Sequence, residues 1–131
     1  MRIRLFFAFL FALPLFFSSA LAFQEINNIT PREASELLKQ APEKITLLDV
    51  RTRKEYDDGH IEGAINADYL KNNFREELES LPPDKPLLMY CRSGQRTLGA
   101  SRAAKDAGFK KIYVLEKGIE DWRKAGLPIV K

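Results

Sequence analysis

The sequence predicts an α/β fold, an open parallel sheet of about five strands with helices on both faces. Short apolar segments alternate with amphipathic segments along residues 23–131, and this alternation is typical of consecutive strand–helix–strand units. The apolar segments at 45–50 and 87–90 are hydrophobic enough for strands inside a parallel sheet, because both faces of such a strand are covered.

Residues 30–41 are predicted to form the first helix. Thr30 has the position of an N-cap, with Pro31 at the first helical position and Glu33 three residues after the cap, so a capping box is expected. The apolar residues that follow recur with the spacing of one helix face, at Ala34, Leu37, Leu38 and Ala41.

The next part of the chain predicts a strand at 45–50 and a short helix after it. Thr52 and Glu55 have the spacing of a second capping box, and Gly59 ends the helix. The remaining elements are apolar runs or apolar repeats bounded by glycine or proline. They are strands at 64–66, 87–90 and 112–115, and helices at 74–81, 97–107 and 119–124.

Residues 1–22 are predicted to be a cleaved export signal. A basic start precedes an apolar stretch at 5–17, and residues 20–22 have the A-x-A form of a cleavage site. The apolar stretch is shorter than the roughly 20 residues that span a bilayer, so a membrane anchor is the weaker alternative. We therefore expect a domain at 23–131, in a periplasmic or secreted protein without stable membrane association after cleavage.

Charge and residue counts limit the classes of partner. The formal net charge of +3 falls to +1 without Arg2 and Arg4, and residues 23–131 contain no long run of Lys or Arg. A nucleic-acid partner is therefore not expected. With one cysteine, Cys91, and one histidine, His60, the sequence offers no metal-ligand cluster and no internal disulfide. We expect neither a metal nor a cofactor.

Cys91 is the main candidate for a functional residue. It is predicted to end a buried strand, and the loop after it leads into a helix whose free N–H groups and dipole favour an anion, including a thiolate. Gly94 allows this loop to curl so that successive N–H groups point inward. The polar, arginine-flanked loop favours a reactive cysteine over a structural one. The residues of this loop are Arg92, Ser93, Gly94, Gln95 and Arg96, and its N–H groups are candidates to bind an anion.

Arg51 is a further candidate for the same site. Sites in open α/β sheets form beyond the carboxyl ends of the strands, and Asp49 and Arg51 stand at the end of the strand predicted at 45–50. Two roles are open for Arg51, contact with the substrate and a structural pair with Asp49.

Several blocks of the sequence resemble the single-domain rhodanese family, in the family order. They are Asp49-Val50-Arg51, Glu55-Tyr56, 59–66, 90–96, and 113–115 followed by Gly118-Ile119 and Trp122. Together with the export signal, the chain is similar to the small periplasmic thiosulfate sulfurtransferases of bacteria. Glu116-Lys117-Gly118 departs from the resemblance, because many relatives carry a glycine pair there, and this leaves the local turn open.

The resemblance implies a two-step sulfur transfer. The Cys91 thiolate attacks the outer sulfur of thiosulfate, sulfite leaves, and the persulfide then gives its terminal sulfur to cyanide or a small thiol. Arg92 and Arg96 hold the sulfonate in this scheme, while the loop amides stabilise the persulfide. The expected partners are small molecules, and a protein sulfur acceptor stays open as well.

Two alternatives belong to other functional classes. A cysteine phosphatase or arsenate reductase of the same fold resembles Cys-x5-Arg, whereas Arg96 is the fifth residue after Cys91 and leaves the loop one residue short. The other alternative is a non-catalytic binding or sulfur-carrier module, and such copies of the fold usually lack the cysteine. Both observations favour a sulfurtransferase.

Overall fold

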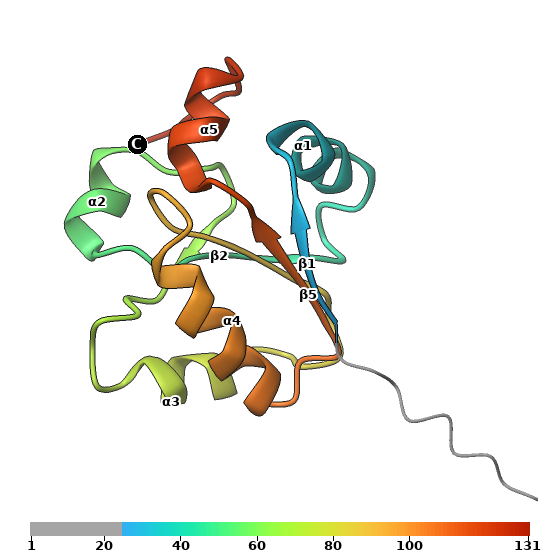
Figure 1. Cartoon of the computed structure of the whole chain (residues 1–131), viewed down its shortest axis with the longest axis vertical. Helices are drawn as coiled ribbons and strands as arrows, with labels where there is room; N and C mark the ends of the chain where they lie inside the picture. The colour runs from blue at the N-terminus through green and yellow to red at the C-terminus, as the bar shows by residue number, and fades with distance from the viewer. Residues whose placement is uncertain (1–24) are drawn as a thin grey trace, which may run out of the picture.

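The computed structural model describes residues 25–131, and Figure 1 shows their arrangement. The predicted export signal lies outside these residues. The strands are β1 (Glu25–Ile29), β2 (Thr46–Asp49), β3 (Ile65–Asn66), β4 (Leu87–Tyr90) and β5 (Lys111–Leu115). The helices are α1 (Pro31–Gln40), α2 (Arg53–Asp58), α3 (Phe74–Glu79), α4 (Arg96–Asp106) and α5 (Gly118–Lys124). None of these helices is both long and apolar enough to cross a membrane.

The strands form one parallel sheet in the order β1-β5-β4-β2-β3. The predicted α/β class and the five-stranded parallel sheet are therefore confirmed. β4 lies at the centre, and its last residue, Tyr90, is level with Asp49 at the end of β2. Because both strands run in the same direction, the chain segments that leave them begin at the same edge of the sheet, where sites of open α/β folds form.

Helices cover both faces of the sheet, as predicted. In Figure 1, α3 and α4 lie on one side of the strands, and α1 and α5 lie on the other. Each side has its own core of buried apolar residues. The helix side chains in these cores include Phe74, Leu78, Ala100 and Ala104 on the first side, and Ala34, Ile119 and Trp122 on the second. The two cores hold α4 and α5 in place at the edge where β4 ends.

β1 is the one strand that the sequence pattern does not identify. It pairs with β5 along all five of its residues, yet its centre is polar, with Asn27 and Asn28 side by side. An edge strand has a neighbour on one side only, so it tolerates polar side chains that a central strand excludes. The apolar pattern that marks β2 and β4 is therefore absent here.

One of the two predicted capping boxes is present. The N–H of Thr30 donates to Glu33 Oε2 at 3.1 Å, and the N–H of Glu33 donates to Thr30 Oγ1 at 3.2 Å. At α2 only half of the box forms. Thr52 Oγ1 accepts from the N–H of Glu55 at 3.2 Å, but the Glu55 carboxylate binds Arg96 and the Thr52 hydroxyl rather than the Thr52 N–H. The prediction of a second capping box was therefore wrong for the bond from the Thr52 N–H to Glu55. The reason is the ion pair that Glu55 forms with Arg96.

Candidate active site

Cys91 directly follows β4, and the residues after it form the loop that leads to α4. This is the position that the sequence predicts. The residue is only 1% exposed. The end of β2 lies beside it, because the N–H of Val50 donates to the carbonyl of Tyr90 at 3.0 Å. The cysteine is therefore a buried side chain at the carboxyl edge of the sheet.

The loop places hydrogen-bond donors at the sulfur and around it. The N–H of Gly94 donates to Cys91 Sγ at 3.1 Å. Within residues 25–131, the backbone N–H groups of Arg92, Ser93 and Gln95 have no hydrogen-bond acceptor. These amides stand just before the N-terminus of α4, where the helix dipole also favours negative charge. The loop is therefore suited to bind an anionic group attached to the sulfur.

The carbonyl groups of the loop are held by α5. The N–H of Ile119 donates to the carbonyl of Cys91 at 2.9 Å, and the N–H of Glu120 donates to the carbonyl of Arg92 at 3.1 Å. Both N–H groups belong to the first turn of α5 and have no partner inside the helix. With its carbonyls bound to α5, the loop keeps its free N–H groups for the site.

Gly118 permits this contact. Its φ is +65°, and a Cβ atom at this position would overlap the carbonyl oxygens of Cys91 and Arg92. The preceding Lys117 has a φ of −114°, which any residue adopts. The turn at Glu116-Lys117-Gly118, which departs from the glycine pair of many relatives, is therefore made with one glycine. Lys117 takes the place of the second glycine without backbone strain.

Gly94 meets the end of β5 in a similar way. Its φ is +96°, and a Cβ atom would overlap the carbonyl oxygen of Glu116. The loop thus packs directly against the backbone after β5, and only glycine fits there. This packing holds the N–H of Gly94 at the sulfur.

Arg96 is bound to Glu55 of α2. Its two terminal nitrogens lie 2.8 and 2.9 Å from the two carboxylate oxygens. The hydrogen bond from Arg96 lowers the pKa of Glu55, and the same bond raises the pKa of Arg96. The pair therefore persists at neutral pH and is lost only in acid, as the pH falls through the lowered pKa of Glu55. The guanidinium fork expected to hold a substrate is already occupied by a carboxylate.

The other loop side chains are more open to solvent. Arg92, Ser93 and Gln95 are exposed. The side chain of Arg92 is 66% exposed, and its Nε lies 3.5 Å from Glu120 Oε1. This contact is long and solvated, so Arg92 is the loop arginine with the freer positive charge.

Arg51 lies in the interior. Its Nη2 donates to Asp49 Oδ2 at 2.7 Å and to the carbonyl of Gly59 at 2.7 Å, and the residue is 4% exposed. Burial opposes its charge, but the hydrogen bonds and the attraction of Asp49 outweigh burial and raise the pKa of Arg51. All its side-chain hydrogen bonds go to Asp49 and Gly59 and none to the cysteine loop. Of its two expected roles, these contacts support the structural one.

Two residues that contact the cysteine or its loop are not identified as site residues from the sequence. Glu55 has the spacing of a helix cap, and only the fold brings it to Arg96. Thr97 follows the loop arginine, and its Oγ1 lies 3.8 Å from Cys91 Sγ. One feature of the sequence could have identified Thr97. It stands six residues after Cys91, on the first turn of the predicted helix, and a hydroxyl there can face back toward the loop.

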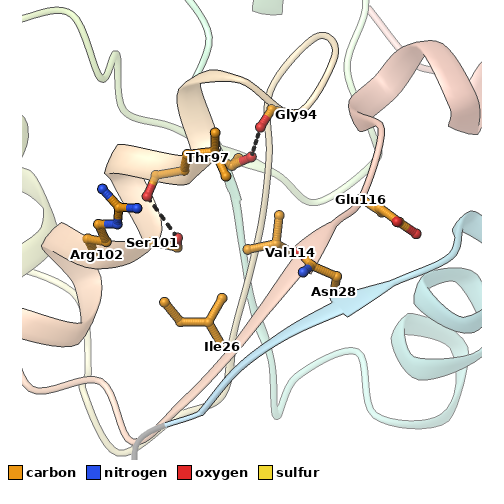
Figure 2. A pocket seen from close by; sticks show the side chains of 9 residues that line it. Ile26, Asn28, Gly94, Thr97, Ser101, Arg102, Val114 and Glu116 are labelled. Atoms are coloured by element: carbon orange, nitrogen blue, oxygen red, sulfur yellow. Dashed lines mark hydrogen bonds between the residues drawn. The ribbon is translucent and has the colours of Figure 1, made fainter.

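A cavity of about 350 Å³ borders the loop on the side of β1, and Figure 2 shows the side chains around it. It is lined by Gly94, Thr97, Leu98, Ser101 and Arg102, by Ile26, Asn28 and Val114 of the sheet, and by Glu116 just after β5. Cys91 does not line it. Among residues 25–131, no three His, Cys, Asp or Glu side chains are grouped so as to hold a metal ion.

Comparisons with known proteins relate the chain to one family. The family described as "Rhodanese-like domain" matches residues 30–125. The chain is 38% identical over 102 residues to the probable adenylyltransferase/sulfurtransferase MoeZ of Mycobacterium tuberculosis, a match that covers 78% of this chain and 26% of MoeZ. The chain thus spans about a quarter of that relative.

Two further relatives are closer to this chain in length. The thiosulfate sulfurtransferase GlpE of Coxiella burnetii is 32% identical over 97 residues, which is 74% of this chain and 87% of GlpE. The crystal structure of a rhodanese-related protein from Thermoplasma volcanium has a TM-score of 0.66 and 29% identity, and the match covers 79% of this chain and 97% of that one.

Replacing Gly94 with alanine tests how strongly the loop depends on its contact with Glu116. Gly108, just after α4, is the matched control, because its φ is +93° and a Cβ atom there meets nothing within 4 Å. Gly108→Ala should lower the free energy of unfolding by about 1 kcal/mol, and Gly94→Ala by about 3 kcal/mol, because overlap adds to backbone strain. Urea unfolding measures both, and equal losses would show that the contact with Glu116 does not constrain the loop.

Proposed function

The chain belongs to the rhodanese-like domain family, a family of the sulfurtransferase type, and on this basis we propose that it is a thiosulfate sulfurtransferase. It transfers the outer sulfur of thiosulfate to cyanide or a thiol through a persulfide on Cys91. The observation that carries the proposal is the hydrogen bond from the N–H of Gly94 to Cys91 Sγ at 3.1 Å. A donor at this distance stabilises negative charge on the sulfur that reacts.

The first step loads the sulfur onto the enzyme. The Cys91 thiolate forms a bond to the outer sulfur of thiosulfate, the bond between the two thiosulfate sulfurs breaks, and sulfite leaves with the electron pair. No general base is needed once the thiol is ionised. The free N–H groups of Arg92, Ser93 and Gln95 are the donors available to the terminal sulfur, which carries the charge after loading.

Burial of the cysteine fits a carrier of one sulfur atom. A residue that is 1% exposed presents little surface to a bulky acceptor. In the persulfide the terminal sulfur stands about 2 Å beyond Sγ, because that is the length of an S–S bond. The acceptor therefore attacks an atom that lies further toward the mouth of the loop than the cysteine itself.

Two side chains differ in what they offer the sulfonate of the donor. Arg92 is exposed and loosely paired, so it supplies positive charge at the mouth. The charge of Arg96 is balanced by Glu55. We therefore assign two different roles to the loop arginines. Arg92 attracts the thiosulfate dianion, and Arg96 holds the start of α4 against α2 through Glu55.

A phosphatase is the alternative with the same nucleophile. A phosphatase arginine must turn its fork to the phosphate, and here both terminal nitrogens of Arg96 are bound to Glu55. The loop is also one residue shorter than Cys-x5-Arg. Both features favour transfer of a single sulfur atom over binding of a tetrahedral phosphate. The remaining alternative, a non-catalytic carrier, shares the persulfide but not the turnover.

We also propose that residues 1–22 are a cleaved export signal and that the protein acts in the periplasm or outside the cell. The support is the basic start, the apolar stretch and the A-x-A site. If the proposal is correct, N-terminal sequencing of protein recovered from an exported fraction reads from Phe23. A chain that retains Met1 in the membrane fraction contradicts cleavage.

The persulfide is the direct test of the sulfurtransferase proposal. Intact-mass measurement after thiosulfate treatment should show one added sulfur on Cys91, lost again when cyanide is added. Cys91→Ser should gain no sulfur and retain less than about a hundredth of the activity, because an unactivated hydroxyl is a poor nucleophile. Faster turnover of p-nitrophenyl phosphate than of thiosulfate would favour the phosphatase alternative. Sulfur loading without turnover would favour the carrier.

The role of Arg92 is tested by Arg92→Ala, with Arg53→Ala as control. Arg53 lies on α2, and its side chain is 69% exposed, compared with 66% for Arg92. At low salt Arg92→Ala should raise the KM for thiosulfate roughly two- to fivefold with little change in kcat, because an exposed charge contributes up to about 1 kcal/mol. The effect should shrink as salt is added. An unchanged KM, or an equal rise in Arg53→Ala, removes Arg92 from substrate binding.

A further inference from the structure

Thr97 is a buried residue of α4 whose hydroxyl faces two acceptors. The residue is 1% exposed. Its Oγ1 donates to the carbonyl of Gly94 at 3.0 Å, the bond drawn in Figure 2, and the same oxygen lies 3.8 Å from Cys91 Sγ. A hydroxyl has one proton, so it can donate to the carbonyl or to the sulfur but not to both at once.

The charge on the sulfur decides which acceptor is favoured. A neutral thiol, or the inner sulfur of a persulfide, is a weak acceptor, and the carbonyl of Gly94 then keeps the proton. A thiolate is charged, and hydrogen bonds to charged acceptors are about twice as strong as neutral ones. Rotation of the O–H about the Cβ–Oγ bond moves the proton from one acceptor to the other, and no heavy atom has to move.

We propose that the Thr97 hydroxyl donates to Cys91 Sγ as negative charge develops there, and so stabilises the cysteine as the leaving group when sulfur passes to the acceptor. This inference rests on the proposed sulfurtransferase function. In the step, the electron pair of the cyanide carbon forms a bond to the outer sulfur. The S–S bond breaks, and its electron pair stays on Sγ as the thiolate. Thiocyanate leaves, and no oxidant or reductant is consumed.

The two halves of the reaction respond in opposite ways to this hydrogen bond. When sulfur is released, Sγ gains negative charge, and a donor stabilises the transition state more than the persulfide. When sulfur is loaded, Sγ loses its charge, and the same donor stabilises the starting thiolate. Loss of the hydroxyl therefore slows release and does not slow loading once the thiol is ionised. A residue that only supports the loop would change both steps alike.

Ser101 provides a matched control one turn further along α4. Its Oγ donates to the carbonyl of Leu98 at 3.2 Å, three residues back, as Thr97 does to Gly94. Ser101 is also buried, at 4% exposure, and it lines the same cavity as Thr97. The two hydroxyls differ in one respect: that of Thr97 lies 3.8 Å from Cys91 Sγ, and that of Ser101 has no contact with the sulfur.

The experiment separates the two half-reactions in the full-length protein. Wild type, Thr97→Val, Thr97→Ser and Ser101→Ala are loaded with thiosulfate and desalted, and loss of the sulfur to excess cyanide is followed by intact mass. The pH is set above the midpoint of Cys91 alkylation in every variant. Thr97→Val should release sulfur about tenfold more slowly, since about 1.4 kcal/mol corresponds to a factor of ten, and should load at least as fast as wild type. Thr97→Ser and Ser101→Ala should behave as wild type.

A second measurement does not depend on turnover. The rate of Cys91 alkylation by iodoacetamide should rise at a higher pH in Thr97→Val than in wild type, because the thiolate has lost a donor. Thr97→Ser should restore the wild-type profile. Thr97→Ala removes the hydroxyl without adding bulk, so it serves if the valine variant does not fold.

The outcomes distinguish this inference from the function on which it rests. The role of Thr97 is overturned if Thr97→Val and Thr97→Ala both release sulfur at the wild-type rate and show the wild-type pH profile of alkylation. It is also overturned if loading and release slow by the same factor. If wild-type protein takes no sulfur from thiosulfate, the proposed donor is wrong. Cys91 is then loaded with sodium polysulfide, and the same comparison of release rates still decides the role of Thr97.

Discussion

The site depends on the contact between the cysteine loop and the first turn of α5. The N–H groups of Ile119 and Glu120 bind the carbonyls of Cys91 and Arg92, and these N–H groups have no acceptor inside their own helix. A peptide group whose carbonyl is held in one direction has its N–H held as well, since the peptide is planar. The direction of the loop amides is thus set by a helix that comes much later in the chain.

Most of the positive charge near the sulfur is paired. Arg51 is bound by Asp49 inside the fold, and Arg96 is bound by Glu55 between α2 and α4. Removing a carboxylate from such a pair leaves a guanidinium without its partner, which is costly where it is buried. The site therefore relies on backbone amides near the sulfur, and Arg92 is the loop arginine left with a largely solvated charge. Amides carry partial charges at fixed positions, which suits a small anionic atom such as a terminal sulfur.

The burial of Cys91, the N–H at its sulfur and the nearby Thr97 hydroxyl are consistent with one chemical requirement. In the proposed reaction, Cys91 Sγ leaves as a thiolate each time the outer sulfur passes to the acceptor, and Gly94 and Thr97 both lie where they can donate to Sγ. The bond from Thr97 to the carbonyl of Gly94 links the two donors. Packing of Gly94 against Glu116 and of Gly118 against the loop keeps this arrangement compact, and both positions exclude a side chain.

The sequence by itself determined the features that depend on near neighbours. The apolar runs predicted β2, β4 and β5, the caps and spacings predicted the start of α1, and the strand–loop–helix pattern put Cys91 at the carboxyl edge of the sheet. The tertiary structure alone decided which groups meet across the fold. The polar strand β1 forms because β5 offers it an edge. Glu55, which has the spacing of a cap, meets Arg96 41 residues away, and Arg51 turns to Asp49 rather than to the loop. The physical reason is that local propensity acts over a few residues, whereas the partner of a charge is decided by the packing of helices and strands distant in the chain.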